Sequence, residues 1–395
     1  MNAIESSIYQ DLLDALQILK PNTTPSNPST VNTYRGVIPN QYILYGPPGT
    51  GKTHTLQTKY ISKFADDNRF VTTFHQSFSY EEFVEGLKPI LVTQENANDS
   101  EDTQEDSLGD VKYKVVKGIF RIACDRAAFL AGYKSLKECI EDTFENRQIK
   151  FSQAIKDNKT VLLGIDEINR GNIASIFGDL ISLIESSKRL GVDNQSEMIV
   201  TLPYSQDKFG VPANLLIVGT MNTSDRSIKL LDSALRRRFK FKELLPNYSV
   251  FVPNPNDNQM QIQAINDAKI ILENINTRIR CLLNKDSQIG HSYLMFAKSD
   301  KAIFTAIVNK IIPLLEEYFY NDIEKVRFVL NENSKTKYPF YQEDKDVKKA
   351  FEAYLLESDI EEEDKTFYEL NYSIKDDGDY KKYLIHLLGK DDSNI

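Results

Sequence analysis

The chain has 395 residues and a formal net charge of −9. Hydrophobic residues make up 41% of it and charged residues 27%, a balance that excludes wholesale disorder. The acidic charge argues against a protein that coats DNA or a membrane surface, because phosphate groups are bound by cationic surfaces. Three cysteines without a Cys-x-x-Cys pair exclude a disulfide framework and a thiolate zinc site.

The start of the chain does not resemble a secretory signal. Glu5, Asp11 and Asp14 interrupt its apolar positions, and no apolar run in the sequence reaches the roughly 18 residues that a membrane span needs. Together with the unpaired cysteines, this predicts a cytoplasmic protein with no membrane partner.

The chain then divides into segments of different character. Apolar residues at spacings of three and four predict a helix over residues 3–20, and a Pro- and Asn-rich linker follows, so residues 1–35 form one segment. Over residues 36–245, short apolar runs alternate with helical stretches such as 172–185, which predicts an α/β domain with a parallel sheet flanked by helices. The predicted strands cover residues 42–45, 70–74, 161–165 and 215–220.

Residues 246–340 show helical periodicity and predict a smaller α-helical subdomain. Two acidic segments complete the organisation. Residues 92–110 hold seven acids and no base, which indicates a solvated inserted loop or hairpin tip. Residues 341–395 hold sixteen acids against eight lysines, with scattered apolar residues that favour a small helical tail.

A complete G-x-x-x-x-G-K-T pattern follows the first predicted strand and opens a helix. Its glycines allow backbone N–H groups to turn inward around a phosphate, and the helix adds its positive end. Lys52 is expected to reach the β- and γ-phosphates and Thr53 to bind Mg²⁺. The expected nucleotide contacts are Gly46, Pro47, Pro48, Gly49, Thr50, Gly51, Lys52, Thr53 and His54.

The run Val161–Ile165 delivers two carboxylates, Asp166 and Glu167, at the end of a predicted strand. In open α/β sheets ligands bind at the carboxyl ends of the strands. Asp166 is expected to hold Mg²⁺, and Glu167 to polarise the water that attacks the γ-phosphate. Alone, such a pair is as readily a solvated turn or helix cap; beside a phosphate loop the catalytic interpretation is favoured.

Two further groups of residues fit the same chemistry. Asn222 ends the strand-like run that begins at Leu215 and is placed to orient the attacking water, although an Asn there also caps turns. Arg236, Arg237 and Arg238 form a run that is either a solvated basic face or an arginine finger for a neighbouring subunit's site. The presence of a phosphate loop in the same chain favours the arginine-finger interpretation.

Several blocks together carry a family resemblance over residues 36–330. They are the phosphate loop and residues 74–86, 166–172, 221–227, 234–239 and 289–293. The chain resembles the AAA+ motor subunit of McrB-type restriction systems, which are modification-dependent and methylcytosine-specific. Ser224 stands where that family usually has Ala.

The resemblance implies an AAA+ P-loop NTPase fold with a helical lid, a hexameric ring, and hydrolysis of GTP or ATP with Mg²⁺. It also implies a separate McrC-like nuclease subunit, with DNA engaged through the assembled complex. Carried over by motif, Asn222 is the sensor, Asp225 and Arg226 belong to the interface loop, and Arg237 and Arg238 act in trans. Because only about 35 residues precede the nucleotide fold, modified bases are expected to be read by a partner or another subunit.

Two other functions fit the motifs. One is an ATP-driven AAA+ remodelling protein that acts on a protein complex, and the other is a nucleotide-gated assembly scaffold with negligible turnover. His291 is open to two interpretations, a nucleotide contact or a structural hydrogen bond. Four histidines without metal-ligand spacing argue against a transition metal.

Overall fold

The structure is a computed structural model that describes residues 41–91, 111–224, 233–343, 368–370 and 379–389. The predicted N-terminal helix and linker, and the acidic segment 92–110, lie outside these residues. The chain forms two compact units. An α/β unit contains residues 41–45 and 52–243, and a helical lid unit contains residues 46–51 and those from 244 onward.

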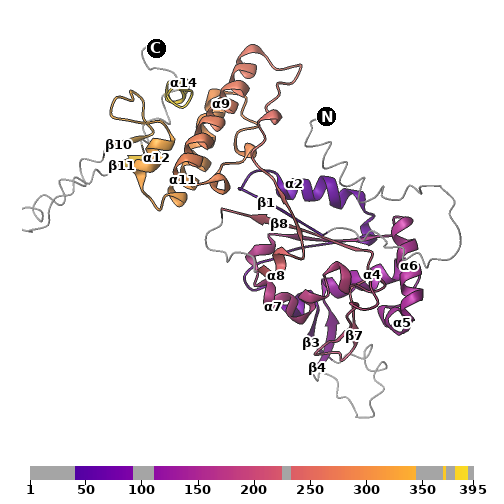
Figure 1. The fold of residues 1–395 in the computed structure, drawn as a ribbon. Helices are drawn as coiled ribbons and strands as arrows, with labels where there is room; N and C mark the ends of the chain where they lie inside the picture. Colours follow the sequence, from indigo (N-terminus) through magenta and orange to yellow (C-terminus); the bar gives the residue numbers. More distant parts are fainter. Residues whose placement is uncertain (1–40, 92–110, 225–232, 344–367, 371–378, 390–395) are drawn as a thin grey trace, which may run out of the picture. The chain divides into compact units, whose positions relative to one another are not determined.

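The α/β unit is built on a five-stranded sheet with the order β2-β5-β8-β1-β9 (Figure 1). The pairs β2–β5, β5–β8 and β1–β9 are parallel. Strand β1 therefore lies between β8 and β9, although β2 and β5 separate it from β8 along the chain. The connections between the strands must cross over the sheet to give this order. The predicted α/β fold with a parallel sheet is confirmed. The strands are β1 Tyr42–Gly46, β2 Arg69–Thr73, β5 Val161–Asp166, β8 Leu215–Asn222 and β9 Lys240–Glu243.

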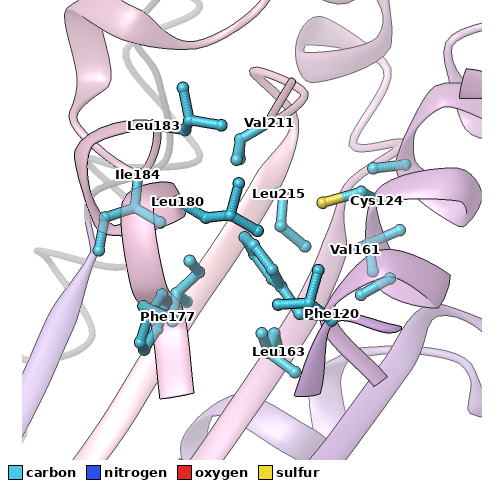
Figure 2. Close-up of a cluster of buried hydrophobic side chains, with 14 of the residues drawn as sticks. Phe120, Cys124, Val161, Leu163, Phe177, Leu180, Leu183, Ile184, Val211 and Leu215 are labelled. Carbon is cyan, nitrogen blue, oxygen red and sulfur yellow. The ribbon is translucent and has the colours of Figure 1, made fainter. Parts of the chain in front are cut away.

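Helices cover both faces of this sheet, which is why β5 is buried along nearly its whole length. Leu56, from the segment after the phosphate loop, lies against Gly164 on one face. On the other face Phe120 and Cys124 of α4 pack with Val161 and neighbouring apolar side chains (Figure 2). The α-helices of this unit are α2 Lys52–Thr55, α3 Tyr80–Phe83, α4 Ile119–Leu130, α5 Leu136–Glu141, α6 Phe144–Lys156, α7 Ile173–Phe177 and α8 Ser233–Arg236.

The helical stretch predicted over residues 172–185 is interrupted. The α-helix α7 stops at Phe177, and a 3₁₀ segment, Gly178–Ser182, follows. Gly178 has φ 52°, a left-handed value that interrupts α-helical hydrogen bonding and that glycine adopts at little cost. The apolar residues beyond it still enter the core, so the hydrophobic pattern was real although the helix was not continuous.

A β-hairpin projects from the sheet unit. Strands β3 Glu85–Leu91 and β4 Val111–Lys117 pair antiparallel, with Leu91 opposite Val111, so residues 92–110 connect the ends of two paired strands. At its base, the fully buried Glu85 carboxylate accepts a hydrogen bond from Arg121 and two from backbone N–H groups, Tyr204 and Ser205, at 3.0 Å each. The latter lie between two short strands, β6 Val200–Thr201 and β7 Lys208–Phe209.

The lid unit has its own hydrophobic core around a long helix, α9 Gln259–Leu282. The helix begins with a reciprocal cap in which Asn258 and Gln261 each accept the other's backbone N–H at 2.9 Å. Its buried apolar residues recur at helical spacing and face the remaining helices, α10 Asp300–Ala306, α11 Ile312–Tyr318 and α12 Ile323–Val329. The predicted helical lid is confirmed. In the described ranges no helix is long and apolar enough to cross a membrane.

The C-terminal segment contributes to the lid core. Its described parts are an antiparallel pair, β10 Tyr341–Glu343 and β11 Tyr368–Leu370, and a short helix, α14 Lys381–Leu384. The prediction of a helical tail thus missed a strand pair. Tyr383, Leu384, Leu387 and Leu388 are buried in the lid core.

Candidate nucleotide site

The phosphate loop runs from the end of β1 to the start of α2. Gly49 and Gly51 have φ of +75° and +80°, values that residues with a Cβ rarely adopt. The Thr50 hydroxyl donates to the Pro47 carbonyl at 2.9 Å and closes the turn. Alternating left-handed residues direct successive N–H groups to one side of the chain, which is the arrangement that binds a phosphate.

Lys52 and Thr53 begin α2 within the α/β unit. The Lys52 side chain is almost fully buried, and burial lowers its pKa to about 8, while the negative charges of Glu167 and Asp166 act in the opposite direction. The Thr53 hydroxyl donates to both Asp166 oxygens, at 3.1 and 3.3 Å. The structure therefore brings together the lysine, the threonine and both carboxylates predicted from sequence.

Asp166 ends β5, and its neighbour on β8 supports it. The buried Thr220 hydroxyl donates to Asp166 Oδ1 and accepts the Glu167 N–H at 3.0 Å. The sequence analysis missed Thr220. The available signal was its position two residues before Asn222, because residues two apart on a strand share a face.

Glu167 has a left-handed backbone, with φ 52° and ψ 47°. This conformation is uncommon for a residue with a side chain and marks a position held by its surroundings. Asn222 Nδ2 donates to Glu167 Oε1 at 2.6 Å, and Arg170 Nε lies 3.4 Å from Oε2. The carboxylate is thus oriented from both sides, by the predicted sensor and by an arginine whose contact the sequence did not indicate.

Asn169 holds the backbone of Asn222 in place. Its Nδ2 donates to the Asn222 carbonyl at 3.1 Å, and its side chain is largely buried. Sequence reasoning placed Asn169 within a family block and gave it no separate role. Its contact depends on β5 and β8 being neighbours, which is a property of the sheet.

The residues present fit a magnesium ion. Mg²⁺ prefers oxygen ligands, and the Thr53 hydroxyl and Asp166 carboxylate are oxygen donors within 3.3 Å of each other. Within the described part of the chain, no group of three or more His, Cys, Asp or Glu could hold a metal alone. This suits an ion that takes its other ligands from water and phosphates. When bound, it neutralises charge on those phosphates.

The predicted arginines differ in their surroundings. Arg236 and Arg237 are exposed. Arg238 instead pairs with Glu185 Oε1 at 2.9 Å, and its side chain is only 5% exposed. Asp225 and Arg226 lie outside the described residues, so their predicted interface role stays a prediction.

Within the lid unit, residues 290–292 contact the phosphate loop through backbone hydrogen bonds. The Gly290 N–H donates to the Pro48 carbonyl at 2.9 Å, and the Ser292 N–H to the Gly49 carbonyl at 3.0 Å. A Cβ on Gly290 would lie 1.9 Å from the Gly49 carbonyl carbon, so only glycine fits there. We call residues 290–292 the strap.

His54, which the sequence predicted as a nucleotide contact, is exposed on α2.

A glycine-rich loop after β1, a buried lysine, and an Asp–Glu pair at the end of β5 define a P-loop nucleoside triphosphatase, a hydrolase. The family model "AAA domain (dynein-related subfamily)" matches residues 41–239, and "McrB, alpha-helical lid domain" matches residues 267–327. The chain therefore belongs to the AAA domain family, and its helical region is similar to the lid domain of McrB.

Two curated proteins are similar over most of the chain. The Type IV methyl-directed restriction enzyme EcoKMcrB subunit of Escherichia coli (strain K12) is 29% identical over 338 residues. That match covers 82% of this chain and 62% of the relative. The chain therefore spans less than two thirds of the relative's length. The Type II restriction enzyme BsuMI component YdiS of Bacillus subtilis (strain 168) is 25% identical over 319 residues, which cover 74% of this chain and 82% of the relative.

Proposed function

We propose that the chain hydrolyses GTP or ATP as the ring-forming motor subunit of a cytoplasmic DNA restriction complex. The observation that carries the hydrolytic role is the Glu167 carboxylate, oriented by Asn222 and Arg170 beside the Thr53–Asp166 pair. Similarity to subunits of two restriction enzymes supports the restriction role.

In the proposed reaction, water attacks the γ-phosphate and the bond to the β-phosphate oxygen breaks. Glu167 accepts the proton of the attacking water, and the Asn222 amide orients that water and the carboxylate. The Lys52 ammonium stabilises negative charge on the β- and γ-phosphates. Thr53 and Asp166 would hold Mg²⁺.

We further propose that catalysis requires a neighbouring copy of the chain in a ring, hexameric as in McrB-type proteins. The exposed Arg237 is better suited to reach a neighbour than Arg238, which is paired with Glu185 in its own unit. DNA cleavage is assigned to a separate McrC-like nuclease subunit.

The test is nucleotide turnover by the purified chain with GTP and ATP side by side, with and without the candidate nuclease subunit. Wild type is expected to hydrolyse at least one nucleotide, faster with the nuclease, and Lys52→Ala is expected to bind neither. No turnover with either nucleotide in the presence of the nuclease would overturn the hydrolytic proposal. Turnover that is indifferent to the nuclease would overturn the restriction role.

A further inference from the structure

Arg189 is a fully buried arginine that donates hydrogen bonds to three uncharged oxygen atoms. Its Nε donates to the Ile184 carbonyl at 3.3 Å, one terminal nitrogen donates to the Leu215 carbonyl, and the other donates to Gln41 Oε1 at 2.9 Å. Ile184 and Leu215 belong to the hydrophobic core of the α/β unit (Figure 2). Because burying a cation against uncharged acceptors is costly, we expect this arginine to hold an arrangement that an apolar residue could not hold.

The side-chain amide of Gln41 is the group that Arg189 orients. Gln41 is also buried, and because its Oε1 accepts from Arg189, its Nε2 faces the other way. There it donates to the Ile184 carbonyl and, at 3.0 Å, to the Arg238 carbonyl. All these residues belong to the α/β unit. The backbone of Arg238 is therefore joined to the core through an amide whose orientation a buried guanidinium fixes.

Gln41 also binds the backbone a little further from Arg237. The Lys240 N–H donates to the Gln41 carbonyl at 2.8 Å, so the main chain and the side chain of Gln41 both hold residues that follow Arg237. Phe239, between these two contacts, is buried. The backbone is thus fixed directly after Arg237, whereas Arg237 itself is exposed.

We propose that Gln41 and Arg189 are positioning residues for Arg237, because they hold its backbone where the guanidinium can reach the nucleotide site of a neighbouring copy. This inference rests on the proposed action of Arg237 in trans and names the groups of its own subunit that support it. A group that must meet charge developing in the transition state loses much of its effect when it is displaced by about 1 Å. Loss of the Gln41 donor should therefore slow turnover by roughly tenfold to a hundredfold and leave nucleotide binding intact.

Three substitutions separate this role from a purely structural one. Gln41→Glu removes both donated hydrogen bonds, yet its carboxylate can still accept from Arg189, so the fold should persist. Gln41→Met removes the same donors without adding a charge. Asn214→Leu is the matched control, because Asn214 is fully buried in the same unit and donates to two carbonyls, those of Ala127 and Lys159, at 2.9 Å each.

The experiment measures turnover of GTP and ATP, binding of their non-hydrolysable analogues and denaturant unfolding for each variant. We expect both Gln41 variants to bind the preferred analogue within about threefold of wild type and to turn it over roughly tenfold to a hundredfold more slowly. Mixing either variant with Lys52→Ala subunits, whose Arg237 is intact, should raise turnover, whereas mixing with Arg237→Ala subunits should not. Asn214→Leu should unfold at lower denaturant, and its folded fraction should turn over nucleotide like wild type.

Normal turnover by both Gln41 variants would overturn the proposal. So would the absence of recovery with Lys52→Ala subunits, equal recovery with Arg237→Ala subunits, or the same recovery pattern in Asn214→Leu. If Arg237→Ala is impaired while the Gln41 variants are not, this inference alone fails. If Arg237→Ala turns over nucleotide like wild type, the proposed action in trans fails with it.

Discussion

The two units of this protein are held together internally by different kinds of hydrogen bond near their predicted nucleotide-binding residues. In the α/β unit, side chains at the carboxyl ends of neighbouring strands hold one another, as Asn222 and Thr220 of β8 do with Glu167 and Asp166 of β5. In the lid unit, backbone N–H groups of the strap hold carbonyls of the phosphate loop. We propose that the first arrangement supplies the chemistry, and the second couples the loop to the hydrophobic core of the lid.

This difference predicts separable effects. Substitutions at the strand ends should change turnover with little effect on folding, whereas substitutions in the lid core should change stability.

The largest effect is expected for Arg237→Ala, because an arginine that stabilises the transition state contributes roughly 10³ to 10⁵ in rate. Turnover should fall while nucleotide binding is kept, and the exposed neighbour in Arg236→Ala serves as the matched control. Mixing Arg237→Ala subunits with Lys52→Ala subunits should restore part of the activity. An absence of recovery in mixed assemblies would argue against action in trans.

Glu167→Gln should lower turnover by roughly 10² to 10⁴, the usual contribution of a general base. The amide can still accept from Asn222 but cannot take a proton from water, so nucleotide binding should persist. Single-turnover hydrolysis and analogue binding measure the two properties. Glu141→Gln, an exposed change on α5 in the same unit, should leave both unaltered. Normal turnover by Glu167→Gln would remove this residue from the mechanism.

Leu387→Ala tests whether the C-terminal segment belongs to the lid core. Leu387 is fully buried there, so its truncation should cost about 2–5 kcal/mol of unfolding free energy. Denaturant unfolding measures the loss, and Leu282→Ala, at a position 37% exposed on α9, is the control. Equal stability of the two variants would show that this segment is an appendage.

The smallest effect concerns Glu332, whose pKa burial raises to about 7 from 4.5. Arg327 and His386 face this carboxylate, with Arg327 Nε at 3.4 Å and His386 Nε2 at 3.8 Å. Between pH 4.5 and about 7 the folded lid holds a proton that the unfolded chain has lost. This group's contribution to stability should therefore fall as pH rises through that interval, by at most roughly 3 kcal/mol.

Glu332→Gln should remove that pH dependence, because an amide does not titrate. Thermal unfolding of the lid from pH 4.5 to 8 compares the variant with wild type, and the exposed Glu317→Gln is the control. An unchanged slope in Glu332→Gln would show that another group causes the pH dependence.

Much of the fold followed from local pattern. The four predicted strands correspond to β1, β2, β5 and β8. The sequences of β5 and β8 are long apolar runs that end in polar residues, which is typical of strands buried on both faces. The short strand β9 was missed, since Lys240–Glu243 has one apolar residue among three charged ones and follows the arginine run. The helical stretch predicted over 172–185 consists of a short α-helix and a 3₁₀ segment, because apolar spacing does not reveal where a glycine adopts a left-handed conformation.

The sequence alone predicted the residues to which we assign the chemistry: the phosphate loop, Lys52, Thr53, Asp166, Glu167 and Asn222 each stand in a local pattern that indicates a role. Only the tertiary structure decided which groups support them. Thr220, Arg170 and the strap act through contacts between segments, and the partners of a polar group are set by strand order and packing. Arg237 and Arg238 are equivalent in the sequence. The fold distinguishes them because it places Glu185 beside Arg238.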